Sequence, residues 1–147
     1  MLRTSLRPAL AAVALSTFLL TGAPSFAATE TFSADLKGAT EVPPNDSAGT
    51  GTVAATLDTA SKKFSFTINY AGLTGAATAA HFHGPAAAGA NAPPVVPIPP
   101  GSLATPIKGE ATLTDAQIAD LEGGKWYFNV HTAAHGPGEI RGQVMKK

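Results

Sequence analysis

The stretch KKFSFTINYAG (residues 62–72) places large apolar side chains at every second position. Successive side chains of an extended chain point to opposite faces. Phe64, Phe66, Ile68 and Tyr70 therefore share one face, and the small polar residues between them share the other. Such a period of two is typical of a β-strand with one face in a hydrophobic core. This stretch predicts a protein whose core is formed by the inner faces of β-sheets.

The segment before it, TVAATLDT (52–59), alternates in the same way, and a short polar link joins the two. Together they predict an antiparallel hairpin. Further strands are predicted at 31–38, 77–83, 106–113, 125–131 and 138–145. About seven short strands separated by turn residues favour an all-β antiparallel fold, which is either a β-sandwich or a Greek-key barrel.

Two segments interrupt this series of strands. Residues 114–117 read Thr-Asp-Ala-Gln, which is a capping box, and they predict one short helix that ends at a Gly-Gly pair. Residues 84–106 are dense in proline, glycine and alanine. Because a central strand does not accommodate so many prolines, this segment is predicted to be a long surface loop, with Val95, Val96 and Ile98 packed against the core.

The first 27 residues have the pattern of a secretory signal peptide. Arg3 and Arg7 precede an apolar run over residues 9–20, and Ser-Phe-Ala then fits the small-x-small cleavage pattern before residue 28. The apolar run is shorter than the ~20 residues that a membrane span needs. The sequence therefore predicts cleavage after Ala27, no membrane span in the mature chain, and a secreted or periplasmic protein.

The remaining residues, 28–147, are predicted to form a single domain with its core at about 31–144. Cleavage removes two of the ten basic residues and none of the ten acidic ones, which leaves a net charge of −2. This balance argues against nucleic acid as a partner. The chain has no cysteine, which excludes disulfides, cysteine nucleophiles, zinc fingers and blue-copper sites.

All four histidines of the chain lie in two similar stretches, AAHFHGPA (79–86) and VHTAAHGPG (130–138). His81 and His83 are two residues apart on a predicted strand, so their imidazoles project from the same face about 6.5–7 Å apart. His131 ends the strand WYFNVH, on the face opposite its large apolar residues. If these strands are neighbours, the three imidazoles can converge on one ion.

Neutral imidazoles suit divalent copper, zinc and nickel, and copper has the highest affinity among the divalent ions. Copper is therefore the expected ion, with zinc as the alternative. The proposed ligands are His81, His83 and His131, with His135 from the following loop as a fourth and Glu41 as a candidate carboxylate. The competing interpretation is that His-Gly-Pro forms turns and that the imidazoles only hydrogen-bond backbone carbonyl groups at the strand ends.

Glu139 and Arg141 are also two residues apart on a predicted strand. The preferred interpretation of this pair is an ion pair at the rim of the fold, which contributes little stability. The alternative is a pair of side chains that orient His131 or His135 around a metal. Catalysis is not expected, since the chain has no Gly-x-Ser-x-Gly motif.

Four segments resemble the CHRD domain, a family named for its occurrence in chordin and common in secreted bacterial proteins. They are LKGATEVPP (36–44), AHFHGP (80–85), NVHT (129–132) and GEIRG (138–142). The resemblance runs from about residue 31 to 144. It implies an immunoglobulin-like all-β barrel or sandwich, in agreement with the strand pattern, and it implies little about chemistry.

In chordin these domains belong to an extracellular antagonist of growth-factor signalling, so the resemblance also suggests an interaction module. His81, His83 and His131 belong to the motifs shared with the family, whereas His135 is an addition. The sequence thus predicts a non-catalytic, exported protein that binds a transition metal. The alternative is an extracytoplasmic protein-interaction or envelope-structural domain with purely structural histidines.

Overall fold

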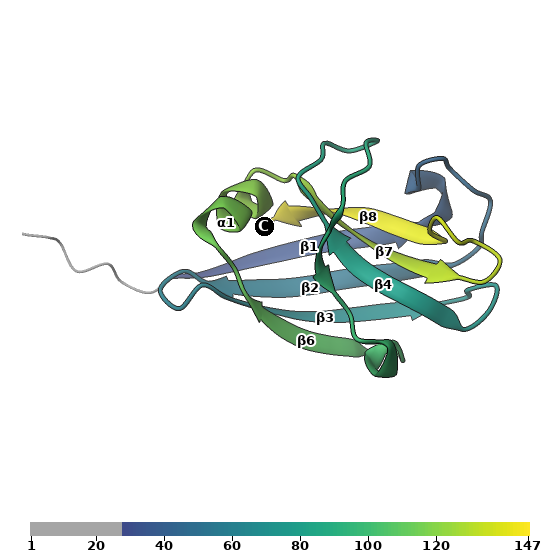
Figure 1. Ribbon diagram of the computed structural model, residues 1–147, viewed down its shortest axis with the longest axis horizontal. Coiled ribbons are helices and arrows are strands. Elements are labelled where there is room, and N and C mark those ends of the chain that lie inside the picture. The colour runs from purple at the N-terminus through teal and green to yellow at the C-terminus, as the bar shows by residue number, and fades with distance from the viewer. Residues whose placement is uncertain (1–27) are drawn as a thin grey trace, which may run out of the picture.

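The strands follow from the alternating pattern, and the helix follows from its capping box. The computed structural model describes residues 28–147, so the predicted signal peptide lies outside the described residues. All seven predicted strands are present, together with one further short strand and the single predicted α-helix (Figure 1). The elements are β1 (Thr29–Lys37), η1 (Gly38–Thr40), β2 (Thr50–Asp58), β3 (Lys63–Ala71), β4 (Ala77–His83), β5 (Pro94–Pro97), η2 (Pro100–Ser102), β6 (Ile107–Thr112), α1 (Asp115–Glu122), β7 (Trp126–Thr132) and β8 (Ile140–Lys146).

The eight strands form one sheet in the order β5-β4-β7-β8-β1-β2-β3-β6, and every neighbouring pair is antiparallel. Strands β3 and β4 follow each other in the chain but are separated by four strands in this order. The rings of Phe64 and Phe66 nevertheless contact Phe82 of β4, with centroids 5.2 and 5.0 Å apart. The sheet therefore curls until its two halves face each other, which confirms the predicted all-β barrel or sandwich with one short helix (Figure 1).

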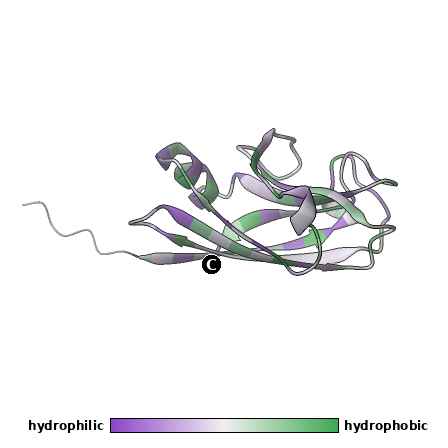
Figure 2. Cartoon of the chain, turned by 60° about the horizontal axis from the view of Figure 1, so that its bottom comes forward, coloured by the Kyte–Doolittle hydropathy of each residue, from purple (hydrophilic) through white to green (hydrophobic). Residues whose placement is uncertain are grey.

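The core lies between these halves and is formed by every second residue of the strands. Apolar and polar residues alternate along the strands in Figure 2. Phe64 and Ile68 of β3 and Trp126 and Phe128 of β7 are fully buried. Burying each such side chain contributes about 1.5–3 kcal/mol, which explains how the domain is stable without a disulfide.

Residues 84–106 differ from the sequence prediction in one respect. The segment is largely irregular, and Val96 and Ile98 are buried as predicted. However, Pro94–Pro97 forms the short strand β5, which pairs with β4 at an edge of the sheet. An edge strand needs hydrogen bonds on one side only, so it tolerates proline where a central strand does not.

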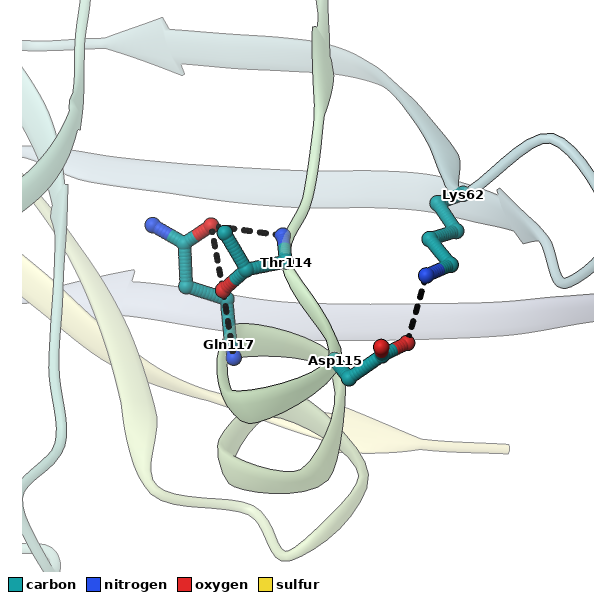
Figure 3. A network of polar contacts seen from close by, with 4 residues as sticks. All are labelled: Lys62, Thr114, Asp115 and Gln117. Atoms are coloured by element: carbon teal, nitrogen blue, oxygen red, sulfur yellow. Dashed lines mark hydrogen bonds and ion pairs between the residues drawn. The ribbon is translucent and has the colours of Figure 1, made fainter.

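The start of α1 is closed by the predicted capping box. The Thr114 hydroxyl accepts a hydrogen bond from the Gln117 backbone amide at 3.2 Å, and Gln117 Oε1 accepts one from the Thr114 amide at 2.9 Å (Figure 3). Asp115 in the first turn also pairs with Lys62 at 2.7 Å. That pair is exposed and contributes little, so the capping box is the main local stabilisation of this helix.

Replacing Thr114 by alanine is therefore expected to lower the free energy of unfolding by about 1 kcal/mol, since one amide at the helix start loses its acceptor. Urea denaturation followed by circular dichroism measures this change. Thr114→Ser keeps the hydroxyl and should retain the stability. Equal losses in both variants would show that the threonine methyl group, and not the cap, is responsible.

Candidate metal centre

The pairing of β4 with β7 brings three of the four histidines to one face of the sheet. In this pair His81 lies opposite Asn129, and Ala79 lies opposite His131. Because side chains alternate, His81 and His83 of β4 share the face that carries Asn129 and His131 of β7. The opposite face of both strands points into the core. The prediction that His131 reaches the face of His81 and His83 is confirmed.

The three imidazoles lie close enough to hold one ion after a small adjustment. His81 Nδ1 is 3.3 Å from His131 Nε2. One nitrogen from each of His81, His83 and His131 lies within 4.8 Å of the other two. Two donors bound to one ion at about 2.1 Å can be at most about 4.2 Å apart. A pair at the 4.8 Å limit would therefore have to close by at least about 0.6 Å to bind one ion.

Backbone carbonyl groups determine which nitrogen of two of these rings carries the proton. His83 Nδ1 lies 2.8 Å from the Ala92 carbonyl oxygen, and His131 Nδ1 lies 2.8 Å from that of Gly136. A carbonyl oxygen only accepts, so both Nδ1 atoms must be donors. In a neutral ring the lone pair is then on Nε2. Both Nε2 atoms point into the group, as metal-binding histidines require.

The surroundings of the site favour neutral imidazoles. Burial lowers the pKa of His81, and the nearby His131 and His83 lower it further. Burial also lowers the pKa of His83, although the hydrogen bonds with Ala92 and Asn129 oppose this change. Neutral imidazole is the form that binds metals, so the lowered pKa values of His81 and His83 favour coordination.

Two side chains support His83: Tyr127, which the sequence did not assign to the site, and Arg141, which it offered as an orienting residue for His131 or His135. The Tyr127 ring stacks on His83, with centroids 4.6 Å apart and an interplanar angle of 3°. On Tyr127 lies the Arg141 guanidinium, 3.4 Å from the ring centroid. Arg141 also donates to Asn91 Oδ1 at 2.8 Å and to the Ala90 carbonyl oxygen. For Tyr127 the only sequence signal was the alternation that places it on one face with Asn129 and His131.

Glu139 does not pair with Arg141, so the preferred interpretation of a rim ion pair is wrong. Both residues are buried, with exposed fractions of 0% and 2%. Glu139 accepts hydrogen bonds from Ser47 Oγ at 2.7 Å, Thr132 Oγ1 at 2.5 Å, and both the amide and hydroxyl of Thr74, at 2.7 and 2.8 Å. Burial alone would raise the pKa of Glu139, but these hydrogen bonds outweigh it and lower the pKa to about 2.

Glu41 and His135 lie beside the three-histidine group but are not members of it. Both line a cavity of about 140 Å³ next to Gly138. Glu41 is 4% exposed, and its Oε1 has no hydrogen-bond partner among residues 28–147. Burial raises its pKa to about 7, against the opposing effects of the Arg141 charge and of hydrogen bonds from the Val42 backbone and the Asn129 amide. Metal ligation by either residue stays a prediction.

Comparison with known proteins agrees with this description. None of the helices within residues 28–147 is long and apolar enough to cross a membrane. Neither the curated proteins nor the solved structures contain a significant match. A family model described as the CHRD domain matches residues 32–144, which include most of β1, all of β2 to β7 and most of β8, together with all four histidines. The chain therefore belongs to the CHRD domain family.

Proposed function

We propose that this protein binds a transition metal ion through His81, His83 and His131, with copper as the expected ion and zinc as the alternative. The observation that carries the proposal is the pair of Nδ1–H bonds to backbone carbonyls, which turns two Nε2 lone pairs toward the third imidazole. Imidazole nitrogens suit both ions, and divalent copper has the higher affinity for such donors.

The proposal includes export through a signal peptide cleaved after Ala27, and a role in binding without catalysis. Export is supported by the two arginines, the apolar run and the small-x-small pattern of the first 27 residues. The non-catalytic role is supported by a sequence without cysteine or a Gly-x-Ser-x-Gly motif.

A second candidate function is an extracytoplasmic interaction or envelope-structural domain whose histidines are structural. One observation favours it: His83 and His131 each hold a loop in place, through the carbonyl groups of Ala92 and Gly136. Hydrogen bonds of this kind stabilise loops even when no ion binds. In that case the imidazoles would matter for folding, and added metal would have no effect on stability.

Divalent copper or zinc is expected to raise the melting temperature of chelator-stripped protein, because a ligand that binds only the folded state stabilises it. At a free ion concentration of 100 times Kd the gain is about 2.7 kcal/mol. Differential scanning fluorimetry with each ion measures the shift. The double variant His81→Ala/His83→Ala should lose it.

His135→Ala provides the matched comparison, because it removes the one histidine outside the group. It should retain the metal-dependent shift if His135 is not a ligand, and it should lose part of the shift if the predicted fourth ligand is real. The proposed function would be contradicted by the absence of a shift with both ions, or by an unchanged shift in the double variant.

A further inference from the structure

Asn129 lies inside the three-histidine group, although no metal-site motif in the sequence includes it. It faces His81 across the β4–β7 pair. Its Oδ1 is 3.0 Å from His83 Nε2 and 3.0 Å from His131 Nε2. Since both Nδ1 atoms are donors to carbonyl groups, both Nε2 atoms present lone pairs to this oxygen. With both rings neutral, three acceptors thus face one another, and a proton lies between them only when a ring is protonated and donates to Oδ1.

Glu41 determines which way the Asn129 amide is turned. A Cβ atom built on Gly138 would be 2.2 Å from Glu41 Oε1 and 2.8 Å from Asn129 Nδ2, so the two side chains meet at this glycine. The opposite amide orientation would direct Oδ1 at the ionised form of a carboxyl group that is 4% exposed and whose Oε1 has no partner among residues 28–147. In the structure Nδ2 lies on the Glu41 side, and the amide oxygen faces the imidazoles.

The distances around this oxygen match those between donors that share one ion. Donors about 2.0–2.1 Å from an ion are about 3.0–3.4 Å apart at bond angles between about 90° and 109°. The observed separations are 3.0 Å from Asn129 Oδ1 to each of two nitrogens and 3.3 Å between His81 Nδ1 and His131 Nε2. Because His131 Nε2 carries a lone pair, His81 Nδ1 is the donor in the hydrogen bond between them, and metal binding requires the His81 proton to move to its Nε2. A cation at the centre would then bind four facing lone pairs as one ligand set.

We propose that Asn129 Oδ1 is the fourth protein donor of the metal site, completing a set of three imidazole nitrogens and one amide oxygen, and that Glu41 is the positioning residue that holds the amide. This inference rests on the proposed function. An amide oxygen is a hard donor, and imidazole is intermediate between hard and soft. The only methionine of the described residues, Met145, lies outside the group with 53% of its surface exposed. The site thus has no thioether donor to select monovalent copper, and its donors suit divalent copper or zinc.

Electron paramagnetic resonance of the copper(II) protein, together with copper(II) affinities measured by chelator competition, tests this inference. Asn129→Leu removes the oxygen donor and should weaken binding at least tenfold, at the lower end of the effects of changes around metal ligands. Asn129→Asp keeps an oxygen at the same place and should restore the affinity, with a changed spectrum because the donor is now a carboxylate. Asn69→Leu, at an exposed position of β3, is the matched control and should leave both measurements unchanged.

The outcomes separate this inference from the proposed function. If the wild-type protein binds neither ion, the proposed function fails and this inference fails with it. If the wild type binds but Asn129→Leu keeps the same affinity and spectrum, Asn129 is not a donor, and the three-histidine site stands without it. If Asn129→Leu does not fold, Asn129→Asp decides, because a wild-type spectrum in that variant would overturn the inference. Glu41→Gln keeps the Asn129 oxygen and should shift the affinity less than Asn129→Leu. A loss in Glu41→Gln without a loss in Asn129→Leu would make Glu41 the donor instead.

Discussion

Replacing Glu139 by alanine is expected to lower the free energy of unfolding by about 3–5 kcal/mol. The side chain is fully buried, and its carboxylate accepts hydrogen bonds from Ser47, Thr74 and Thr132. Its removal leaves these donors without a partner in the interior, at about 1–3 kcal/mol each where no water replaces the carboxylate. Urea denaturation measures the change. Glu110→Ala, which removes a glutamate from an exposed pair with Lys63, should change the stability by less than about 0.5 kcal/mol.

The stabilisation by Glu139 should also depend on pH in a defined direction. Its pKa is about 2 in the folded protein, against 4.5 for the free side chain. Because the folded-state pKa is the lower one, the unfolded chain binds the proton more readily. The contribution is therefore complete above about pH 5 and is lost as the pH falls through 4.5 toward 2.

Comparing the wild type with Glu139→Gln isolates this effect, since all other carboxyl groups are the same in both proteins. The difference in their free energies of unfolding should be constant above about pH 5 and should shrink below it. A difference that stays constant down to pH 2.5 would mean that the ionised carboxylate is not what the four hydrogen bonds stabilise.

The strands could be predicted because their evidence is local. In KKFSFTINYAG (62–72) the alternation predicts a strand and its inner face, and the similar segment before it predicts a hairpin. The structure has both, since β3 pairs with β2. The strand β5 was missed for the opposite reason: Pro94 and Pro97 contradict local strand propensity, and the segment is extended only because β4 offers it an open edge. The open edge of β4 depends on tertiary structure, so the sequence of residues 94–97 alone does not indicate a strand.

The metal centre was predictable only in part. The spacing of His81 and His83 and the position of His131 on its strand give the faces of the side chains. The register between β4 and β7, which decides how close the imidazoles come, depends on strands more than forty residues apart in the chain. The role of Asn129 depends on the same register. His135 shares the sequence pattern, but the turn after β7 places it outside the group.

The burial of Glu139 was not predictable from the sequence near it. Its partners Ser47 and Thr74 come from two loops far away in the chain. A Glu-x-Arg pair at the start of a strand is more often an exposed ion pair. Here the loops that cover the two side chains bury them, and Glu139 and Arg141 form separate hydrogen-bond networks. The missing information is therefore the path of the loops, which alternation in the strands does not contain.

Replacing Arg141 by alanine is expected to be the second most damaging change, with a loss of about 3–5 kcal/mol in the free energy of unfolding. The side chain is 2% exposed, so truncation leaves a cavity of the kind that large-to-small changes create in a core. It also leaves the acceptors Asn91 Oδ1 and Ala90 O without their donor and uncovers the Tyr127 ring. Chemical denaturation measures the loss, and Lys108→Ala, which removes an exposed cation, is the matched control.

The functional consequence follows from what Arg141 holds in place. Ala90 and Asn91 belong to the same loop as Ala92, whose carbonyl fixes the proton on His83 Nδ1. Loss of this restraint frees the imidazole to change tautomer and orientation, so the affinity for copper(II) should fall about 10- to 100-fold, as for other groups that orient metal ligands. Arg141→Lys keeps the charge, but a lysine has no planar group to stack on Tyr127 and to donate to both Asn91 and Ala90. It should therefore recover little of the affinity. If copper(II) binds Arg141→Ala as tightly as Lys108→Ala, the loop does not orient His83, and stacking on Tyr127 alone is enough to hold the ring.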